Sequence, residues 1–144
     1  WCDWSSDVCS SDLQLLDAFC HALDKGFRYA FEFRDPGWFR EETCDTLKRN
    51  GMAFCIFDFA GLRSPDAVTA DFVYIRLHGP LKEPYRGGYP DSFLQERAEA
   101  IRRWLGEGRA VYVFFDNTME GDAVRDALKL SHLLTGRTNP EALH

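Results

Sequence analysis

Residues 72–78, FVYIRLH, decide the fold because two kinds of side chain alternate along them. One row is apolar and the other is aromatic or polar, namely Val73, Ile75 and Leu77 against Tyr74, Arg76 and His78. A period of two predicts a β-strand, since successive side chains point to opposite faces of a sheet. The second row ends in ionisable groups, which is typical of side chains that point into a barrel with its chemistry at the C-terminal mouth.

Three further segments are rich in aromatic and aliphatic residues and are predicted strands: residues 29–34 (YAFEFR), 53–58 (AFCIFD) and 110–116 (AVYVFFD). Apolar residues at helical spacing predict helices at residues 14–24, 38–49, 93–105 and 122–134. Ser92 and Gln95 have the spacing of a capping box at the start of the third helix. Residues 79–91 (GPLKEPYRGGYPD) are predicted to form a long loop, and long loops often carry function.

Strands that alternate with helices predict parallel βαβ units, with the helices covering the outer face of the sheet. A doubly wound open sheet would show continuous aliphatic strands and a Gly-rich phosphate-binding turn, and this sequence has neither. The predicted fold class is therefore α/β, a TIM-barrel-like (β/α)8 fold. A complete barrel takes roughly 250 residues, so four parallel strands with their helices are about the second half of one.

The chain has 144 residues, of which 45% are hydrophobic and 15% aromatic, and this suffices for one core. Its formal net charge is −6 and it has no run of five basic residues, so nucleic acid is not favoured as a partner. Its apolar stretches are only strand-sized, which excludes a transmembrane helix, and the same acidic charge balance argues against a membrane partner. Outside residues 1–13 it has three cysteines without metal-ligand spacing, so a cytoplasmic location is predicted.

Residues 1–13 (WCDWSSDVCSSDL) have no apolar period and lack the basic start and apolar run of a secretory signal. The stretch DWSSDVCSSDL matches one reading frame of a common sequencing-library adaptor. The segment is therefore interpreted as a non-native tail, with a genuine disordered tail as the alternative. The predicted division of the chain is a tail at residues 1–13, a partial barrel domain at 14–136 and a C-terminal tail at 137–144.

Three segments in this order and spacing resemble the YecE-like family, catalogued as domain of unknown function 72. They are YAFEFRDPGWF at residues 29–39, FVYIRLHGP at 72–80 with YRGGY at 85–89, and VYVFFDNT at 111–118 with Gly121. The resemblance covers residues 14–136 and implies a TIM barrel in which the four strands are the fifth to the eighth. It supplies a fold and no defined activity. The sequence departs from the family pattern at residues 35–38, where DPGW replaces His-Pro-Ser-Trp, and at residues 116–117, where DN replaces two Asn.

Charged residues at the C-terminal ends of the predicted strands would gather around one mouth of a barrel. The candidate catalytic residues are Glu32 or Asp58 as general base and His78 as a proton shuttle. Arg34 and Arg76 are candidate clamps for a phosphate or carboxylate. The other candidate ligand-binding residues follow the last strand or lie on the Gly-rich loop: Asp116, Asn117, Tyr85, Arg86 and Tyr89. The structural alternative is that these charges only neutralise one another and that the loop is an ordinary packed turn.

Glu32, Asp58, His78 and Asp116 are also ligand types for manganese or magnesium. Neither H-x-H nor H-E-x-x-H spacing occurs and two arginines oppose a cation, so a divalent metal is not favoured, no metal ligand is assigned and the cofactor is unknown. The chain is interpreted as a fragment of an uncharacterised YecE-like protein, and the predicted function of the intact parent is an enzyme that acts on a small anionic or phosphorylated substrate at the barrel mouth. The alternative is a non-catalytic protein that binds a nucleotide or a nucleic-acid end, and the sequence does not decide between them.

Two further expectations concern pairing. Arg34 has Glu32 two residues away on the same face and is expected to pair with it. Arg76 has no acid at that spacing in its own strand, so it is expected to be free for a ligand. Four strands cannot close a barrel, so self-association through the exposed strand edges is also predicted.

Overall fold

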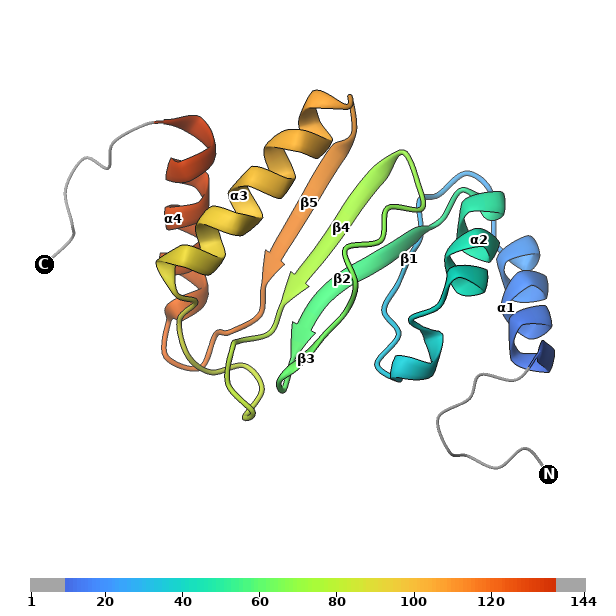
Figure 1. Cartoon of the computed structure of the whole chain (residues 1–144), viewed down its shortest axis with the longest axis horizontal. Helices are drawn as coiled ribbons and strands as arrows, with labels where there is room; N and C mark the ends of the chain where they lie inside the picture. Colours follow the sequence, from blue (N-terminus) through green and yellow to red (C-terminus); the bar gives the residue numbers. More distant parts are fainter. Residues whose placement is uncertain (1–9, 137–144) are drawn as a thin grey trace, which may run out of the picture.

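A computed structural model of the chain describes residues 10–136, which form one β-sheet flanked by helices (Figure 1). The elements in chain order are α1 (Ser10–Ala22), β1 (Ala30–Phe31), the 3-10 helix η1 (Pro36–Trp38), α2 (Glu41–Asn50), β2 (Ala53–Phe59), β3 (Leu62–Arg63), β4 (Phe72–Leu77), α3 (Asp91–Gly106), β5 (Ala110–Phe115) and α4 (Asp122–Thr135). Each predicted strand and helix therefore has a counterpart.

Strands β1, β2, β4 and β5 pair in parallel, and each lies beside the next one along this path. The two-residue β3 pairs antiparallel with β2 across a turn at Ala60 and Gly61, which both have positive φ. A doubly wound sheet reverses its strand order at a switch point, whereas a barrel keeps the order sequential. The observed order is therefore that of the predicted half barrel.

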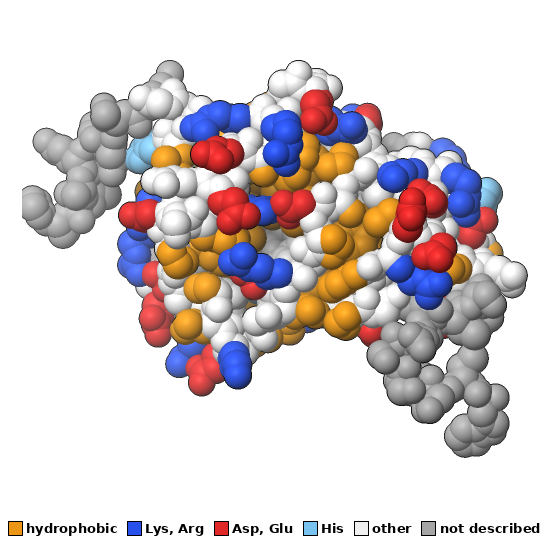
Figure 2. Space-filling view, viewed as in Figure 1, with side chains coloured by type: hydrophobic (Ala, Val, Ile, Leu, Met, Phe, Trp, Pro, Cys, Tyr) orange, Lys and Arg blue, Asp and Glu red, His pale blue; other side chains and the backbone are white. Residues whose placement is uncertain are grey.

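The two predicted rows of β4 lie on opposite faces of the sheet. Val73, Ile75 and Leu77 are buried on the outer face, where they pack with residues of α3 and α4: Leu94, Ala98, Ile101, Trp104 and Leu130. A second core cluster lies beneath α1 and α2 and contains Leu16, Cys20, Leu47, Met52 and Phe54. The two helix pairs thus flank opposite ends of the sheet (Figure 1). In the same view, Figure 2 shows acidic and basic side chains interspersed over the surface, with hydrophobic side chains between them.

β1 is shorter than the strand predicted at residues 29–34. Its ladder with β2 ends at the pair Phe31 and Phe54. The next aromatic ring, Phe33, stacks on Trp38 with the ring centroids 4.9 Å apart and also packs against Phe54 of β2. Glu32 therefore lies just beyond the ladder instead of within it.

Two predicted helix starts also differ. The helix predicted at residues 38–49 is divided into η1 and α2, because the Asp35 carboxylate accepts a hydrogen bond from the Gly37 N–H and caps the short 3-10 turn. The capping box predicted at Ser92 is wrong, since α3 begins at Asp91, two residues before the predicted start, and no side-chain hydrogen bond caps it. The Pro90 carbonyl accepts the first helical N–H groups instead.

Helix α1 begins at Ser10, four residues before the predicted start, so the last part of segment 1–13 is helical. Residues 1–9 and 137–144, on which two of the predicted tails fall, lie outside the described residues. The division into tails and domain stays a prediction. Within residues 10–136, no helix is long and apolar enough to cross a membrane.

Candidate functional site

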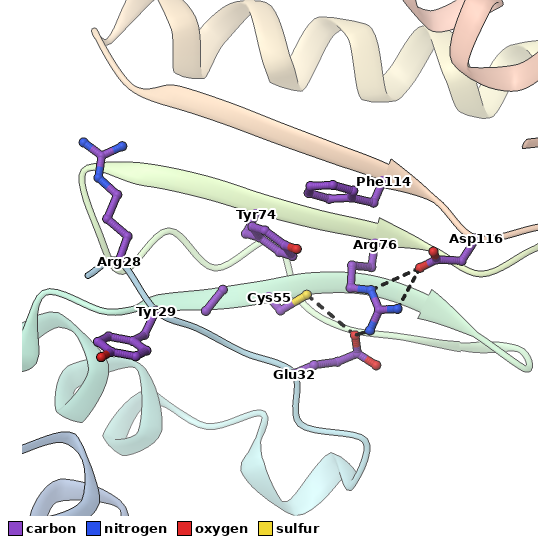
Figure 3. A pocket seen from close by; sticks show the side chains of 9 residues that line it. Arg28, Tyr29, Glu32, Cys55, Tyr74, Arg76, Phe114 and Asp116 are labelled. Carbon is purple, nitrogen blue, oxygen red and sulfur yellow. Dashed lines mark hydrogen bonds and ion pairs between the residues drawn. The ribbon is translucent and has the colours of Figure 1, made fainter. Parts of the chain in front are cut away.

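The face of the sheet opposite the helices, which corresponds to the inside of a barrel, is the lumen face. A cluster of ionised groups lies on it at the C-terminal ends of the strands (Figure 3). Arg76 of β4 stands between two carboxylates: its Nη1 atom is 2.9 Å from Glu32 Oε2 and its Nη2 atom is 3.0 Å from Asp116 Oδ2. The register explains this, since Arg76 pairs with Phe114 and Asp116 lies two residues further along on the same face. The expectation that Arg76 is free for a ligand is therefore wrong, because its partners follow two other strands of the sheet, β1 and β5.

His78 lies behind this ion-pair cluster and is completely buried. Its Nε2 atom is 3.5 Å from Glu32 Oε2, and its Nδ1 atom is 3.4 Å from Asp116 Oδ2. Neither ring nitrogen has a hydrogen-bond partner of good geometry among the described residues. The imidazole thus faces one carboxylate from each side, and a small movement would let it donate to either of them.

Arg34 and two aromatic rings form the rim of the cluster. Arg34 Nε donates to Glu32 Oε1 at 2.8 Å, as predicted, and the guanidinium lies 4.0 Å from the centre of the Phe59 ring. Tyr85 of the Gly-rich loop packs edge-on against His78, with ring centroids 5.7 Å apart. The Tyr85 N–H donates to the His78 carbonyl, so the loop is held over the end of β4.

Burial and charge set the protonation states. Burial alone would raise the pKa of Glu32, but the hydrogen bond from Arg34 and the charge of Arg76 outweigh it and hold this pKa below its usual value. Burial lowers the pKa of His78, and the neighbouring Glu32 only partly opposes the shift. At neutral pH the cluster therefore combines an ionised Glu32 with a neutral imidazole.

An open cavity of about 480 Å³ runs along the lumen face from Arg28 to Asp116 (Figure 3). Tyr74 and Phe114 form an aromatic wall, with their ring centroids 5.0 Å apart. The polar cluster closes the end of the cavity at the C-terminal side of the sheet. The cavity therefore offers both a flat apolar surface and an ionised end to a ligand.

Cys55 of β2 lines this cavity and was not among the predicted site residues. Alternation along β2 is the signal that finds it, since Cys55 shares its face with Ala53 and Phe59. Burial and the nearby Glu32 carboxylate raise the pKa of its thiol to about 12. Cys55 is thus a neutral thiol at physiological pH and not a nucleophile.

We expect the Cys55 thiol to resist alkylation by iodoacetamide at pH 8.5 in the folded protein, because the thiolate is the reactive form. Cys44, which is only half-buried, is the internal control and should react faster. Peptide mass spectrometry after timed quenching measures both rates. Equal labelling of the two cysteines in the native chain would contradict the assignment.

Asp58 does not join the cluster. Its side chain lies on the face of β2 that carries Ile56, where it is 3.4 Å from Arg63 Nε in a small pocket beside α3. Burial raises its pKa despite the charge of Arg63. The prediction that one mouth gathers Asp58 with Glu32 is wrong, because neighbouring residues of a strand point to opposite faces.

Three other predicted ligand-binding residues belong to the Gly-rich loop or form a hydrogen bond with it. The Tyr89 hydroxyl is buried and accepts a hydrogen bond from the Gly79 N–H at 2.8 Å. Asn117 is buried and donates to the Gly87 carbonyl at 2.9 Å. Arg86 pairs with Glu83 at an exposed position. Of the residues predicted on or beside the loop, only Tyr85 and Asp116 thus contact the polar cluster.

No group of three or more His, Cys, Asp or Glu side chains in the described part of the chain is arranged to hold a metal ion. Arg76 occupies the space between the two carboxylates that would be the nearest ligands. A guanidinium in that position opposes a cation electrostatically. These residues therefore do not fit a divalent metal.

Comparison with known proteins identifies the fold. A family model described as "Protein of unknown function DUF72" matches residues 5–143, which include part of the segment interpreted as a tail. A DUF72 family protein of Thermotoga maritima MSB8 is similar in structure, with a TM-score of 0.79 and 26% identity, over 92% of this chain and 55% of that chain. A DUF72 family protein of Enterococcus faecalis V583 has a TM-score of 0.76 and 20% identity, over 99% of this chain and 60% of that one.

No curated protein matches the chain. The chain spans little more than half the length of the two solved structures. Their agreement with the four parallel strands and their helices confirms the predicted partial, TIM-barrel-like α/β fold. The match over nearly the whole sequence confirms the resemblance drawn from the three segments, and this chain belongs to the DUF72 (YecE-like) family.

Proposed function

We propose that the lumen cluster is an acid–base site of an enzyme that acts on a small anionic or phosphorylated substrate. The observation that carries the proposal is the buried His78 ring, whose two nitrogens each face a carboxylate that lines the cavity. Pairs of carboxylates with an imidazole between them are well suited to moving protons. Asp58 has no part in this proposal.

Arg34 is the proposed anchor for the anion. Its side chain is 46% exposed, and within residues 10–136 only its Nε atom forms a hydrogen bond. The terminal guanidinium nitrogens are therefore available for a phosphate or carboxylate oxygen at the rim of the cavity. Arg76, which two carboxylates already hold, orients those carboxylates instead of binding the substrate.

The proposed proton path runs through His78. Glu32, ionised at neutral pH, accepts a proton from the substrate and passes it to His78 Nε2. The proton on Nδ1 passes to Asp116, which faces the cavity with 29% of its side chain exposed. The two transfers together return the imidazole to its neutral form, the form that its burial favours.

Inorganic phosphate is a direct probe of the anchor. In titrations followed by ¹H–¹⁵N NMR at constant ionic strength, phosphate should shift the Arg34 Nε–H signal, and Arg34→Gln should weaken binding about 10-fold or more. Arg103→Gln, at an exposed position on α3, is the matched control and should leave the affinity unchanged. If both variants bind phosphate like the wild type, Arg34 is not the anchor and the charges serve only to neutralise one another.

The aromatic wall favours a second candidate function, the binding of a nucleotide or nucleic-acid end. Tyr74 and Phe114 line the cavity together with Arg76, and bases stack on aromatic rings. The two functions differ in what Phe114→Leu changes. Under this second function the variant weakens binding of adenosine monophosphate but not of inorganic phosphate, whereas under the first it affects neither.

A further inference from the structure

Asp126 of α4 is a buried acid with only 3% of its surface exposed. Its Oδ2 atom accepts a hydrogen bond from the Tyr89 N–H at 2.9 Å and another from Asn117 Nδ2 at 2.8 Å. Both donors are uncharged, and within residues 10–136 no arginine or lysine forms an ion pair with Asp126. Burying a carboxylate without a cationic partner costs stability, and proteins concentrate such costs at functional sites.

The two donors belong to the two segments that enclose the His78 ring. Tyr89 lies on the Gly-rich loop, whose Tyr85 packs edge-on against His78. Asn117 lies on the turn after β5, next to Asp116, whose carboxylate is 3.4 Å from His78 Nδ1. The loop follows β4 and the turn follows β5, so both lie at the C-terminal end of the sheet (Figure 1). One buried carboxylate therefore holds both segments.

Further hydrogen bonds join the two segments to each other. Asn117 Nδ2 also donates to the Gly87 carbonyl at 2.9 Å, and the Met119 N–H donates to the Tyr85 carbonyl at 3.2 Å. Asn117 is completely buried, so water does not compete for the hydrogen bonds of its side chain. The loop and the turn therefore form one hydrogen-bonded unit, which Asp126 anchors to α4.

We propose that Asp126 is a positioning residue of the acid–base site, which holds the Gly-rich loop and Asp116 in place around the His78 ring. The inference rests on the proposed function, in which His78 carries the proton. Asp126 acts through its hydrogen-bond partners, the Tyr89 amide and the Asn117 side chain. Because both partners are neutral donors, the role requires an acceptor oxygen at residue 126 and not a negative charge.

The His78 ring nitrogens, followed by ¹⁵N NMR during a pH titration of the chain, report the position of both segments. In the wild type, burial holds the pKa of His78 below its usual value. Asp126→Ala should release the loop and let water reach the ring, so that His78 titrates at a higher pH. The neighbouring carboxylates, Glu32 and Asp116, act in the same direction. Hydrogen exchange at the Tyr85 amide should become about 10-fold faster or more, because the loop loses its anchor on α4.

Two variants separate positioning from a loss of charge. Asp126→Asn keeps an acceptor oxygen for both donors, so it should restore the wild-type titration of His78 and the wild-type exchange of Tyr85. Asp122→Ala is the matched control, since Asp122 is also a buried acid of α4 but pairs with Arg125 of the same helix. It removes the same charge and should leave both measurements unchanged.

Circular dichroism first establishes that each variant is folded. If Asp126→Ala does not fold, Asn117→Ala takes its place, because it removes the hydrogen bond to the Gly87 carbonyl, and the same two changes are expected. A folded variant whose His78 titrates like the wild type overturns the inference, since Asp126 is then merely structural. Failure of Asp126→Asn to restore the titration also overturns it, because the charge is then what matters. Phosphate binding that Arg34→Gln leaves unchanged would count against the proposed function alone, since the His78 titration does not involve phosphate.

Discussion

Arg76→Ala is expected to lower the free energy of unfolding by about 2 kcal/mol at pH 7. The change removes the guanidinium that pairs with both Glu32 and Asp116, and it leaves the two carboxylates partly buried beside His78. Removing one partner of a buried pair costs about 3–5 kcal/mol, and the smaller figure allows for solvent screening, since the Arg76 side chain is 35% exposed. Urea unfolding at matched protein concentration measures the difference.

The loss of stability in Arg76→Ala should become smaller as the pH falls. The folded-state pKa of Glu32 lies below its unfolded value, so ionised Glu32 stabilises the fold above the unfolded pKa, and this contribution disappears as the pH falls through the folded pKa. Arg76→Ala removes one of the charges that hold this pKa down, so the stabilities of wild type and variant should converge as the pH falls from the unfolded pKa of Glu32 through its lower folded value.

Arg34→Ala is the control for this comparison, because Arg34 also pairs with Glu32 but is 46% exposed. It should cost less than about 1 kcal/mol. An equal loss of stability in the two variants would mean that the position of Arg76 between the carboxylates contributes no more to stability than the exposed pair of Arg34 with Glu32.

The strands and their faces could be predicted because alternation is a local property. The apolar row of residues 72–78 is the buried outer row of β4, and its polar row contains the centre of the site. The same alternation was available for residues 53–58, where Asp58 shares its row with Phe54 and Ile56. Its position in the pocket beside α3 could therefore have been predicted from the sequence.

The partners of Arg76 could not be found by the same reasoning. They lie 44 and 40 residues away in the chain, and only the register across all four parallel strands brings them together. Spacing along one segment identified the pair of Arg34 and Glu32. It missed the pair of Arg76 and Glu32, in which the arginine is better buried. Short strands with similar aromatic composition leave the register open until the whole sheet is known.

The loop that covers His78 depends on Gly79. This residue has a φ of +112°, and a Cβ atom there would lie 2.4 Å from the Arg86 carbonyl oxygen. The close approach lets the loop turn back so that the Tyr85 N–H reaches the His78 carbonyl and the Gly79 N–H reaches the Tyr89 hydroxyl. Any side chain at residue 79 should therefore displace the loop from the end of β4.

Gly79→Ala is expected to lower the free energy of unfolding by about 3 kcal/mol, since a backbone clash is added to the cost of positive φ. Gly108→Ala is the matched control: its φ is +80° and a Cβ atom there meets nothing within 4 Å, so it should cost only about 1 kcal/mol. Urea unfolding compares the stabilities of the two variants, and hydrogen exchange of the Tyr85 amide reports the position of the loop directly.

Because Tyr85 packs against His78 and the loop is anchored at the end of β4, faster exchange at Tyr85 in folded Gly79→Ala would mean that the loop has left the polar cluster. Equal stability losses with unchanged exchange would instead mean that the approach of Gly79 to Arg86 does not hold the loop over His78.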